Sequence, residues 1–156
     1  MTNVLSFDWI VRRSLTAGLL LVSTCAFAVL GQDVSSAQAD GARMKSAVRV
    51  VTAQAYSVHE MMSPAGATVR EFVSPSGQVF GVSWQGPYTP DLQQLLGDYF
   101  EQYMHAAQTF PRSARHVVHI ETDDLVFESA GHMRFIVGRA YLRNKLPDGA
   151  TVDAIR

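Results

Sequence analysis

The chain has 156 residues, of which 47% are hydrophobic and 17% charged, with a formal net charge of −1 at pH 7. This near-neutral balance offers no basic face to a nucleic acid and no polybasic patch to a membrane surface, so we expect neither partner. The only cysteine is Cys25, close to the N-terminus, so the chain beyond it has no disulfide, no thiol nucleophile and no cysteine-bound metal.

The segment 1–28 has the pattern of a secretory signal peptide. Arg12 and Arg13 precede an uncharged run, and Ala26 and Ala28 give the small residues at A-x-A spacing that mark a cleavage site. The uncharged run is too short for a transmembrane helix, which needs about 20 apolar residues. We therefore predict cleavage after Ala28, export to the periplasm or the medium, and a single mature domain over 29–156 without a transmembrane segment.

Four other interpretations of this segment stay open. Cleavage after Ala39 would follow a second A-x-A pattern, and the residues before Cys25 faintly resemble a lipoprotein cleavage box. The two arginines also resemble a twin-arginine export signal. An uncleaved membrane anchor is the last alternative.

The first elements expected in the mature chain are a helix and three strands. A helix over 33–47 begins at Asp33, whose carboxylate can accept a backbone N–H as an N-cap. The stretch 48–60 is rich in Val, Thr, Ala and Tyr without Gly or Pro, which predicts one long strand. Short strands at 68–73 and 78–84 follow, separated by a Ser-Pro-Ser-Gly hairpin turn. Short turns between consecutive strands predict an antiparallel meander.

The strongest pattern is that of a second helix, over 90–108. Thr89 is a suitable N-cap and Pro90 a suitable first helical residue. Apolar residues recur at steps of three and four, which gives one stripe expected to pack on the sheet. Three further strands follow, at 114–121, 125–129 and 132–142, and a last helical turn at 152–156. The order predicts an α+β fold, with an antiparallel sheet of five to six strands in two meanders (helix-βββ-helix-βββ) and the helices packed on one face.

An ordered set of short motifs resembles a known family. The motifs are AFAVLG at 26–31, YSVHE at 56–60, VREFVSPSG at 69–77, WQGP at 84–87, PDL at 90–92, LLGDYF at 95–100, GHMR at 131–134 and GRAYL at 138–142. Together they resemble the family of exported bacterial domains of unknown function numbered 2844 (DUF2844), over nearly the whole mature chain. Val29 departs from the small residue expected there. The resemblance implies an exported single domain and brings no known activity, ligand or catalytic residue.

The segment between the third strand and the second helix is the best candidate for a binding surface. Trp84 and Tyr88 flank Gly86 and Pro87, and aromatic rings on a stiff loop offer large contact area at low entropic cost. This pattern predicts a site for a protein or peptide partner. The alternative is that Trp84 closes the end of the core and Tyr88 packs against the start of the helix.

Two other groups of residues suggest a ligand site. His59 and Glu60 end the first long strand and His132 begins the last, so a sheet that joined those ends would form a possible zinc site. Separately, three arginines on predicted strands would line a cleft for an anion or, alternatively, would pair with glutamates across strands. These arginines are Arg70, Arg134 and Arg139, and the glutamates are Glu71, Glu121 and Glu128.

Motifs for catalysis are lacking in the sequence. No G-x-S-x-G elbow and no glycine-rich phosphate loop occurs, so we assign no catalytic residue and no cofactor. We expect an exported, non-enzymatic accessory protein of the cell envelope that binds a protein or peptide. The alternatives are a carrier or sensor with an apolar ligand held between the sheet and the helix over 90–108, and a metal-dependent enzyme using His59, Glu60 and His132.

Overall fold

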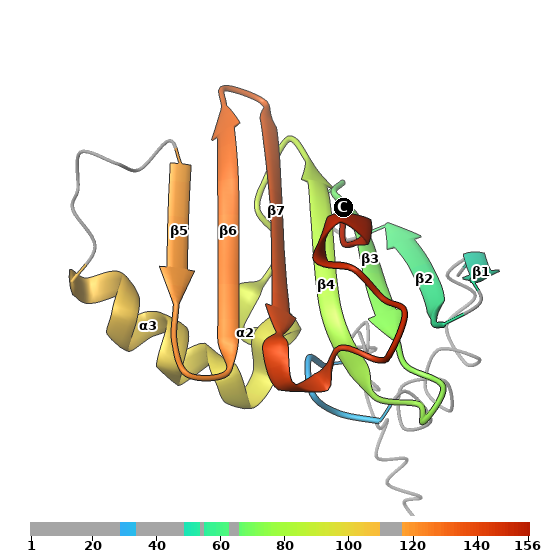
Figure 1. The fold of residues 1–156 in the computed structure, drawn as a ribbon. Coiled ribbons are helices and arrows are strands. Elements are labelled where there is room, and N and C mark those ends of the chain that lie inside the picture. Colours follow the sequence, from blue (N-terminus) through green and yellow to red (C-terminus); the bar gives the residue numbers. More distant parts are fainter. Residues whose placement is uncertain (1–28, 34–48, 54, 63–65, 110–116) are drawn as a thin grey trace, which may run out of the picture.

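A seven-stranded antiparallel sheet, in the order β1-β2-β3-β4-β7-β6-β5, organises the protein (Figure 1). The computed structural model describes residues 29–33, 49–53, 55–62, 66–109 and 117–156. The strands are β1 Arg49–Thr52, β2 Ser57–Met62, β3 Thr68–Val73, β4 Val79–Gly86, β5 Val117–Glu121, β6 Leu125–His132 and β7 Phe135–Leu142. Strands β1 to β4 thus form one side of the sheet and β5 to β7 the other, and the pairing of β4 with β7 joins the two sides.

The prediction of five to six strands was wrong because the stretch 48–60 is not one strand. It folds back as the β1–β2 hairpin, in which Arg49 pairs with Glu60 and Thr52 with Ser57. The N–H of Ala53 donates to the carbonyl of Tyr56 at 2.8 Å and closes the turn. No glycine or proline marks this turn, so the sequence pattern looked continuous.

The element order also differs from the predicted one. Four strands precede the helical segment and three follow it, instead of two sets of three. The helix expected over 33–47 lies, beyond Asp33, outside the described residues. Asp33 itself forms an isolated antiparallel bridge with Gln78, next to the Ser74–Gly77 turn that the sequence predicted.

The predicted helix over 90–108 is present but divided into two. It comprises α2 Leu92–Leu96, the 3-10 turn η1 Gly97–Tyr99 and α3 Phe100–Thr109. Asp91 replaces the predicted cap Thr89, and its side chain accepts hydrogen bonds from the N–H groups of Gln93 and Gln94. Gly97 interrupts the helix with a φ of +52°, a conformation that glycine adopts without a steric penalty.

Each face of the sheet carries its own layer. The helical segment packs on one face, where the main core contains Val82, Trp84 and Phe127 from the sheet together with Leu95 and Leu96 from α2. We call this the helix face. None of the helices in the described part of the chain has the length and apolar character to cross a membrane.

The opposite face is covered only in part. The C-terminal segment, with the short turns η3 Arg143–Lys145 and η4 Val152–Ala154, crosses in front of β4 and β3 (Figure 1). Ile155 is buried there with Phe72, Phe80 and Tyr141 in a second, smaller core. The remainder of this face, over β4, β7, β6 and β5, has no covering element among the described residues. We call it the open face.

Candidate functional site

A row of polar side chains crosses the open face, one from each strand. In sheet order its members are Arg49, Glu60, Arg70, Ser83, Arg139, Glu128 and His119, and each is the register partner of the next. Directly opposed residues on neighbouring antiparallel strands project from the same face. We call this set the polar row.

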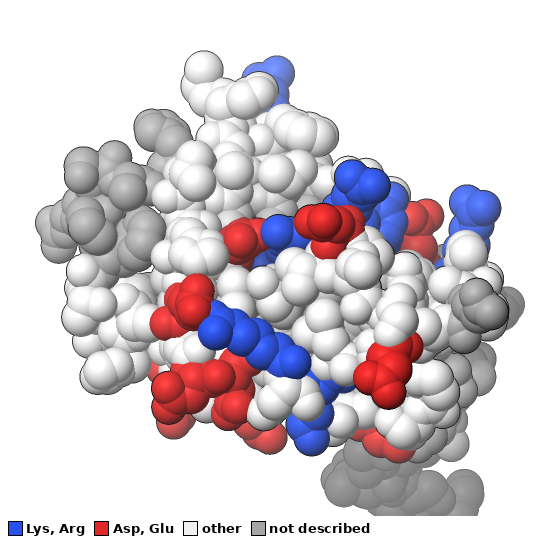
Figure 2. All heavy atoms as spheres, in the orientation of Figure 1, with Lys and Arg blue, Asp and Glu red and all other residues white. Residues whose placement is uncertain are grey.

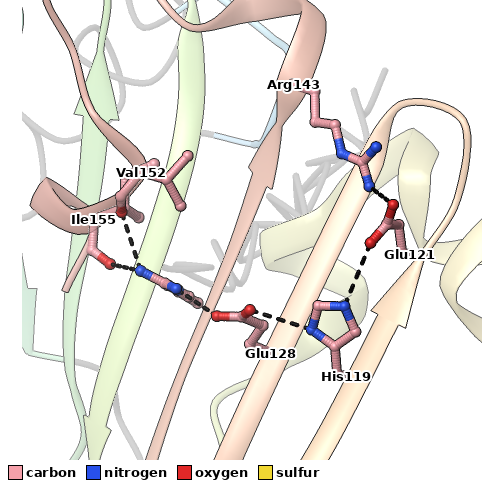
Figure 3. Close-up of polar contacts among 7 residues, drawn as sticks. His119, Glu121, Glu128, Arg143, Val152 and Ile155 are labelled. Carbon is pink, nitrogen blue, oxygen red and sulfur yellow. Dashed lines mark hydrogen bonds and ion pairs between the residues drawn. The ribbon is translucent and has the colours of Figure 1, made fainter.

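One ion pair of the polar row also fixes the C-terminal segment. The Nε of Arg139 donates to Glu128 at 2.6 Å, and its Nη1 donates to the carbonyls of Val152 at 3.0 Å and Ile155 at 3.4 Å (Figure 3). The hydrogen bond from Arg139 is the main reason why the pKa of Glu128 is lowered. Arg139 therefore joins β7, β6 and the segment that borders the open face.

The β5 end of the row continues this network. His119 contacts Glu128 through Nδ1 at 3.2 Å and Glu121 through Nε2 at 3.4 Å (Figure 3). Arg143 forms an ion pair with the same Glu121 and, by donating a hydrogen bond, is the main cause of its lowered pKa. These contacts connect the outer strand β5 to Glu128 on β6 and to Arg143 in η3.

The β2 end of the row is arranged in the same way. The Nε of Arg70 donates to Glu60 at 2.7 Å, and its Nη1 donates to the carbonyl of Arg156 at 3.4 Å. Arg70 and Arg139 thus each form an ion pair with a glutamate on the neighbouring strand farther from β4, and each donates to a carbonyl of the C-terminal segment. In the part of the chain that the structure describes, neither Nη2 group donates to a protein atom.

The centre of the row is a buried hydroxyl. Ser83 is only 2% exposed and lies in register between Arg70 on β3 and Arg139 on β7. Its Oγ has no hydrogen-bond partner among the described residues. Such an atom is unusual, because buried polar side chains in native proteins nearly always have a partner.

A cleft of about 470 Å³ opens above this hydroxyl. Its polar lining includes Arg70, Ser83 and Arg139. Its apolar lining comes from the strands and from the C-terminal segment, and includes Val117, Ala130, Val137 and Ile155. Figure 2 shows the same division on the surface, with a band of charged side chains across the middle of the face and a mostly uncharged area between that band and the tip of the β6–β7 hairpin. Val117, the first residue of β5 and part of the apolar lining, is 64% exposed.

Trp84, the leading residue of the predicted binding loop, is not at the surface. It is 2% exposed, faces the helices, and its ring lies 5.5 Å from that of Phe127. The indole covers Gly138 so closely that a Cβ added at that glycine would overlap the ring atom Cζ2. The prediction of Trp84 as a contact surface was therefore wrong, and its alternative, a residue that closes the core, describes the structure.

The rest of that loop divides into a packed and an exposed part. Gly86 is half-buried, and a Cβ there would lie 2.6 Å from the Cα of Ala67. Pro87 is exposed, and Tyr88 is 66% exposed. Only these two of the four predicted contact residues offer their side chains to a partner.

The three residues of the predicted metal site do not meet. Glu60 points to the open face, where it pairs with Arg70, while His59 points to the helix face opposite Glu71. His132 ends β6, and β3, β4 and β7 lie between that strand and β2. Burial lowers the pKa of His59 and favours its neutral form. Over the described ranges, no group of three or more His, Cys, Asp and Glu side chains is arranged to hold a metal ion.

The two alternatives for the predicted arginines are both partly realised. Arg139 pairs with Glu128 as predicted, whereas Arg70 pairs with Glu60 in place of Glu71. Both also line a cleft, as the anion hypothesis required. Arg134 lies elsewhere, in the β6–β7 turn, with a φ of +69°. Sequence reasoning missed Ser83, because no local motif marks a serine that becomes central only through strand pairing.

The comparisons with known proteins agree with the resemblance found in the sequence. The model of a family described as "Protein of unknown function (DUF2844)" matches residues 26–155, so the chain belongs to that family. No curated protein and no solved structure matches the chain.

Proposed function

We propose that this member of the DUF2844 family is a non-enzymatic binding protein, and that the cleft of the open face holds a small amphipathic ligand. The observation that carries the proposal is that Ser83 lines the cleft while its buried Oγ has no partner among the described residues. A ligand polar group in the cleft would satisfy that hydroxyl. The volume of about 470 Å³ is in the range of small-molecule sites, which are mostly apolar with a few placed polar groups.

The ligand position differs from the one that the sequence suggested. A second cleft of about 470 Å³ does lie between the helical segment and the sheet, where Leu92, Tyr103 and Ile136 contribute to its lining. It contains none of the buried side-chain atoms without a partner that occur in the described residues. The cleft of the open face is therefore the better candidate for the ligand site.

The proposal is tested by titrating the purified protein with decanoic acid and with decanol, using calorimetry. Val137→Asp places a charge in the apolar wall of the open-face cleft, and Val50→Asp makes the same change on the exposed strand β1. We expect at least one of the two amphiphiles to bind, Val137→Asp to abolish that binding, and Val50→Asp to preserve it. The absence of binding by both amphiphiles to the wild type, or equal loss in the two variants, would refute the proposal.

A protein or peptide partner in the cell envelope is the second proposal. The exposure of Pro87 and Tyr88 favours it, since an exposed ring on a loop that begins with a packed glycine suits a contact surface. A photoreactive residue at position 88 should capture one recurrent envelope protein, and the same residue at position 50 should not. Identical products from both positions would count against this proposal.

Export and cleavage after Ala28 remain a proposal that the packing supports. Leu30, two residues after this site, is 1% exposed in the main core, and the N–H of Gly31 donates to the carbonyl of Val79 at 2.8 Å. Cleavage after Ala39 would remove both contacts. N-terminal sequencing of the protein from a periplasmic or medium fraction should therefore begin at Val29, and a start at residue 40 would contradict this assignment.

A further inference from the structure

We infer that the polar group of the ligand is a carboxylate, held between Arg70 and Arg139 above Ser83. This inference rests on the proposed function, because it names the chemistry of the same cleft. Three residues that carry hydrogen-bond donors line the same cleft: Ser83, Arg70 and Arg139. The register places the serine directly between the arginines, on the strand that separates theirs.

The serine supplies the first donor. Ser83 lines the cleft, and its buried Oγ has no partner among the described residues, so a ligand oxygen that reached this hydroxyl would supply the partner it lacks. On the same face, Ser83 lies in register with Arg70 and Arg139, so an anion held between the two arginines would lie above its position. The expected acceptor is an oxygen atom with negative charge, because such hydrogen bonds are shorter and stronger than neutral ones.

The arginines supply the remaining donors and are already held in place. Each uses its Nε for a glutamate on the strand beyond it, at 2.7 Å for Arg70 and 2.6 Å for Arg139. Each uses its Nη1 for a backbone carbonyl of the C-terminal segment, in Arg156 and Ile155 respectively. Two guanidinium groups that already attract carbonyl oxygens at one border of the cleft are suited to attract a carboxylate inside it.

The charge of the cleft lining favours an anionic head group. Arg70, Arg139 and Arg156 line the cleft together with Glu128, so arginines outnumber carboxylates in its lining.

The rest of the ligand is an apolar chain or ring. Val117, Ala130 and Val137 line the cleft and lie in register with one another, two residues along their strands from His119, Glu128 and Arg139 of the polar row. A carboxylate at Ser83 would direct its apolar body across these residues. An amphipathic monocarboxylate, such as a medium-chain fatty acid, satisfies both halves of the cleft.

The test compares decanoic acid with decanol, which share an apolar chain and differ in the charge of the head group. We expect the wild type at pH 7 to bind decanoate at least about tenfold more tightly than decanol, since a hydrogen bond to a charged group contributes this much. Ser83→Ala and Arg70→Gln should each weaken the binding of decanoate by about tenfold and that of decanol by less, so that the preference for decanoate falls. Arg134→Gln removes the same charge outside the open-face cleft and should have no effect.

Two results would overturn the inference, and they have different meanings. If decanol binds as tightly as decanoate and neither Ser83→Ala nor Arg70→Gln changes the ratio, the head group is not a carboxylate while the cleft still binds a ligand. If neither amphiphile binds the wild type, the proposed function fails as well. Circular dichroism shows whether each variant folds. Because Ser83 and Arg70 lie on different strands, one variant can still decide the test if the other does not fold.

Discussion

Arg139 and Glu128 face each other across β7 and β6, and their ion pair of 2.6 Å fixes one side of the cleft. The same guanidinium holds the carbonyl of Val152 at 3.0 Å, so the position of the C-terminal segment depends on a side chain of the sheet. Arg139 therefore connects the sheet wall of the cleft to the C-terminal segment that borders it.

Replacing Glu128 by Gln should change the acid stability of the protein. The hydrogen bond from Arg139 lowers the pKa of Glu128 in the folded state, so its ionised form stabilises the fold above the ordinary carboxyl pKa of 4.5. The free energy of unfolding of the wild type should exceed that of Glu128→Gln by about 0.5 kcal/mol at pH 7, as for other partly exposed pairs. This difference in unfolding free energy should decrease as the pH falls below 4.5, and it should disappear below the lowered pKa of Glu128. Urea denaturation at a series of pH values measures it, and a constant difference down to acidic pH would contradict the assignment.

Trp84 and Tyr88 should differ sharply in what they contribute to stability. Trp84→Ala empties a buried site and should lower the free energy of unfolding by about 3–5 kcal/mol. Tyr88→Ala should change it by less than about 0.5 kcal/mol, because the ring is exposed. Chemical denaturation of both variants makes the comparison, and similar effects of the two substitutions would be inconsistent with the observed packing.

The contact between Gly138 and Trp84 gives a coupled prediction. Gly138→Ala introduces a methyl group where the indole lies and should destabilise the protein by about 1–3 kcal/mol through overpacking. The same substitution should cost less in a Trp84→Leu background, where the ring is gone. A double-mutant cycle of unfolding free energies measures the coupling. Additive effects would mean that the two residues do not touch.

The segment after the expected cleavage site should be needed for stability. Leu30→Ala should cost about 2–5 kcal/mol, as for other fully buried leucines. Gln32→Ala, on the same short segment at an exposed position, serves as the control and should cost far less. Thermal unfolding of chains that begin at Val29 tests this, and a negligible effect of Leu30→Ala would remove the packing argument for cleavage after Ala28.

Local chemistry explains which parts of the fold were predictable. The Ser74–Gly77 hairpin turn was predicted because its residues have strong turn preferences, and Gly77 indeed has a φ of +86°. The β1–β2 hairpin was missed because its turn has no such residue. The interruption of the helix at Gly97 was also missed, since the apolar stripe continues across it.

The candidate site was predictable only in part, because it depends on contacts between distant residues. The role of Arg70 and Arg139 as cleft-lining cations was one of two open alternatives in the sequence. Ser83 joins them through pairing of β4 with β3 and of β4 with β7, and the second pairing links strands that lie on either side of the helical segment in the sequence. No pattern within one strand encodes such a register.

The most direct test of the binding function is native mass spectrometry of the purified protein after incubation with decanoic acid and, separately, with decanol. We predict a one-to-one complex for the wild type and for Val50→Asp, and none for Val137→Asp, whose side chain lines the cleft. A complex that persists in Val137→Asp, or no complex with either decanoic acid or decanol in the wild type, would contradict the open face as the binding site.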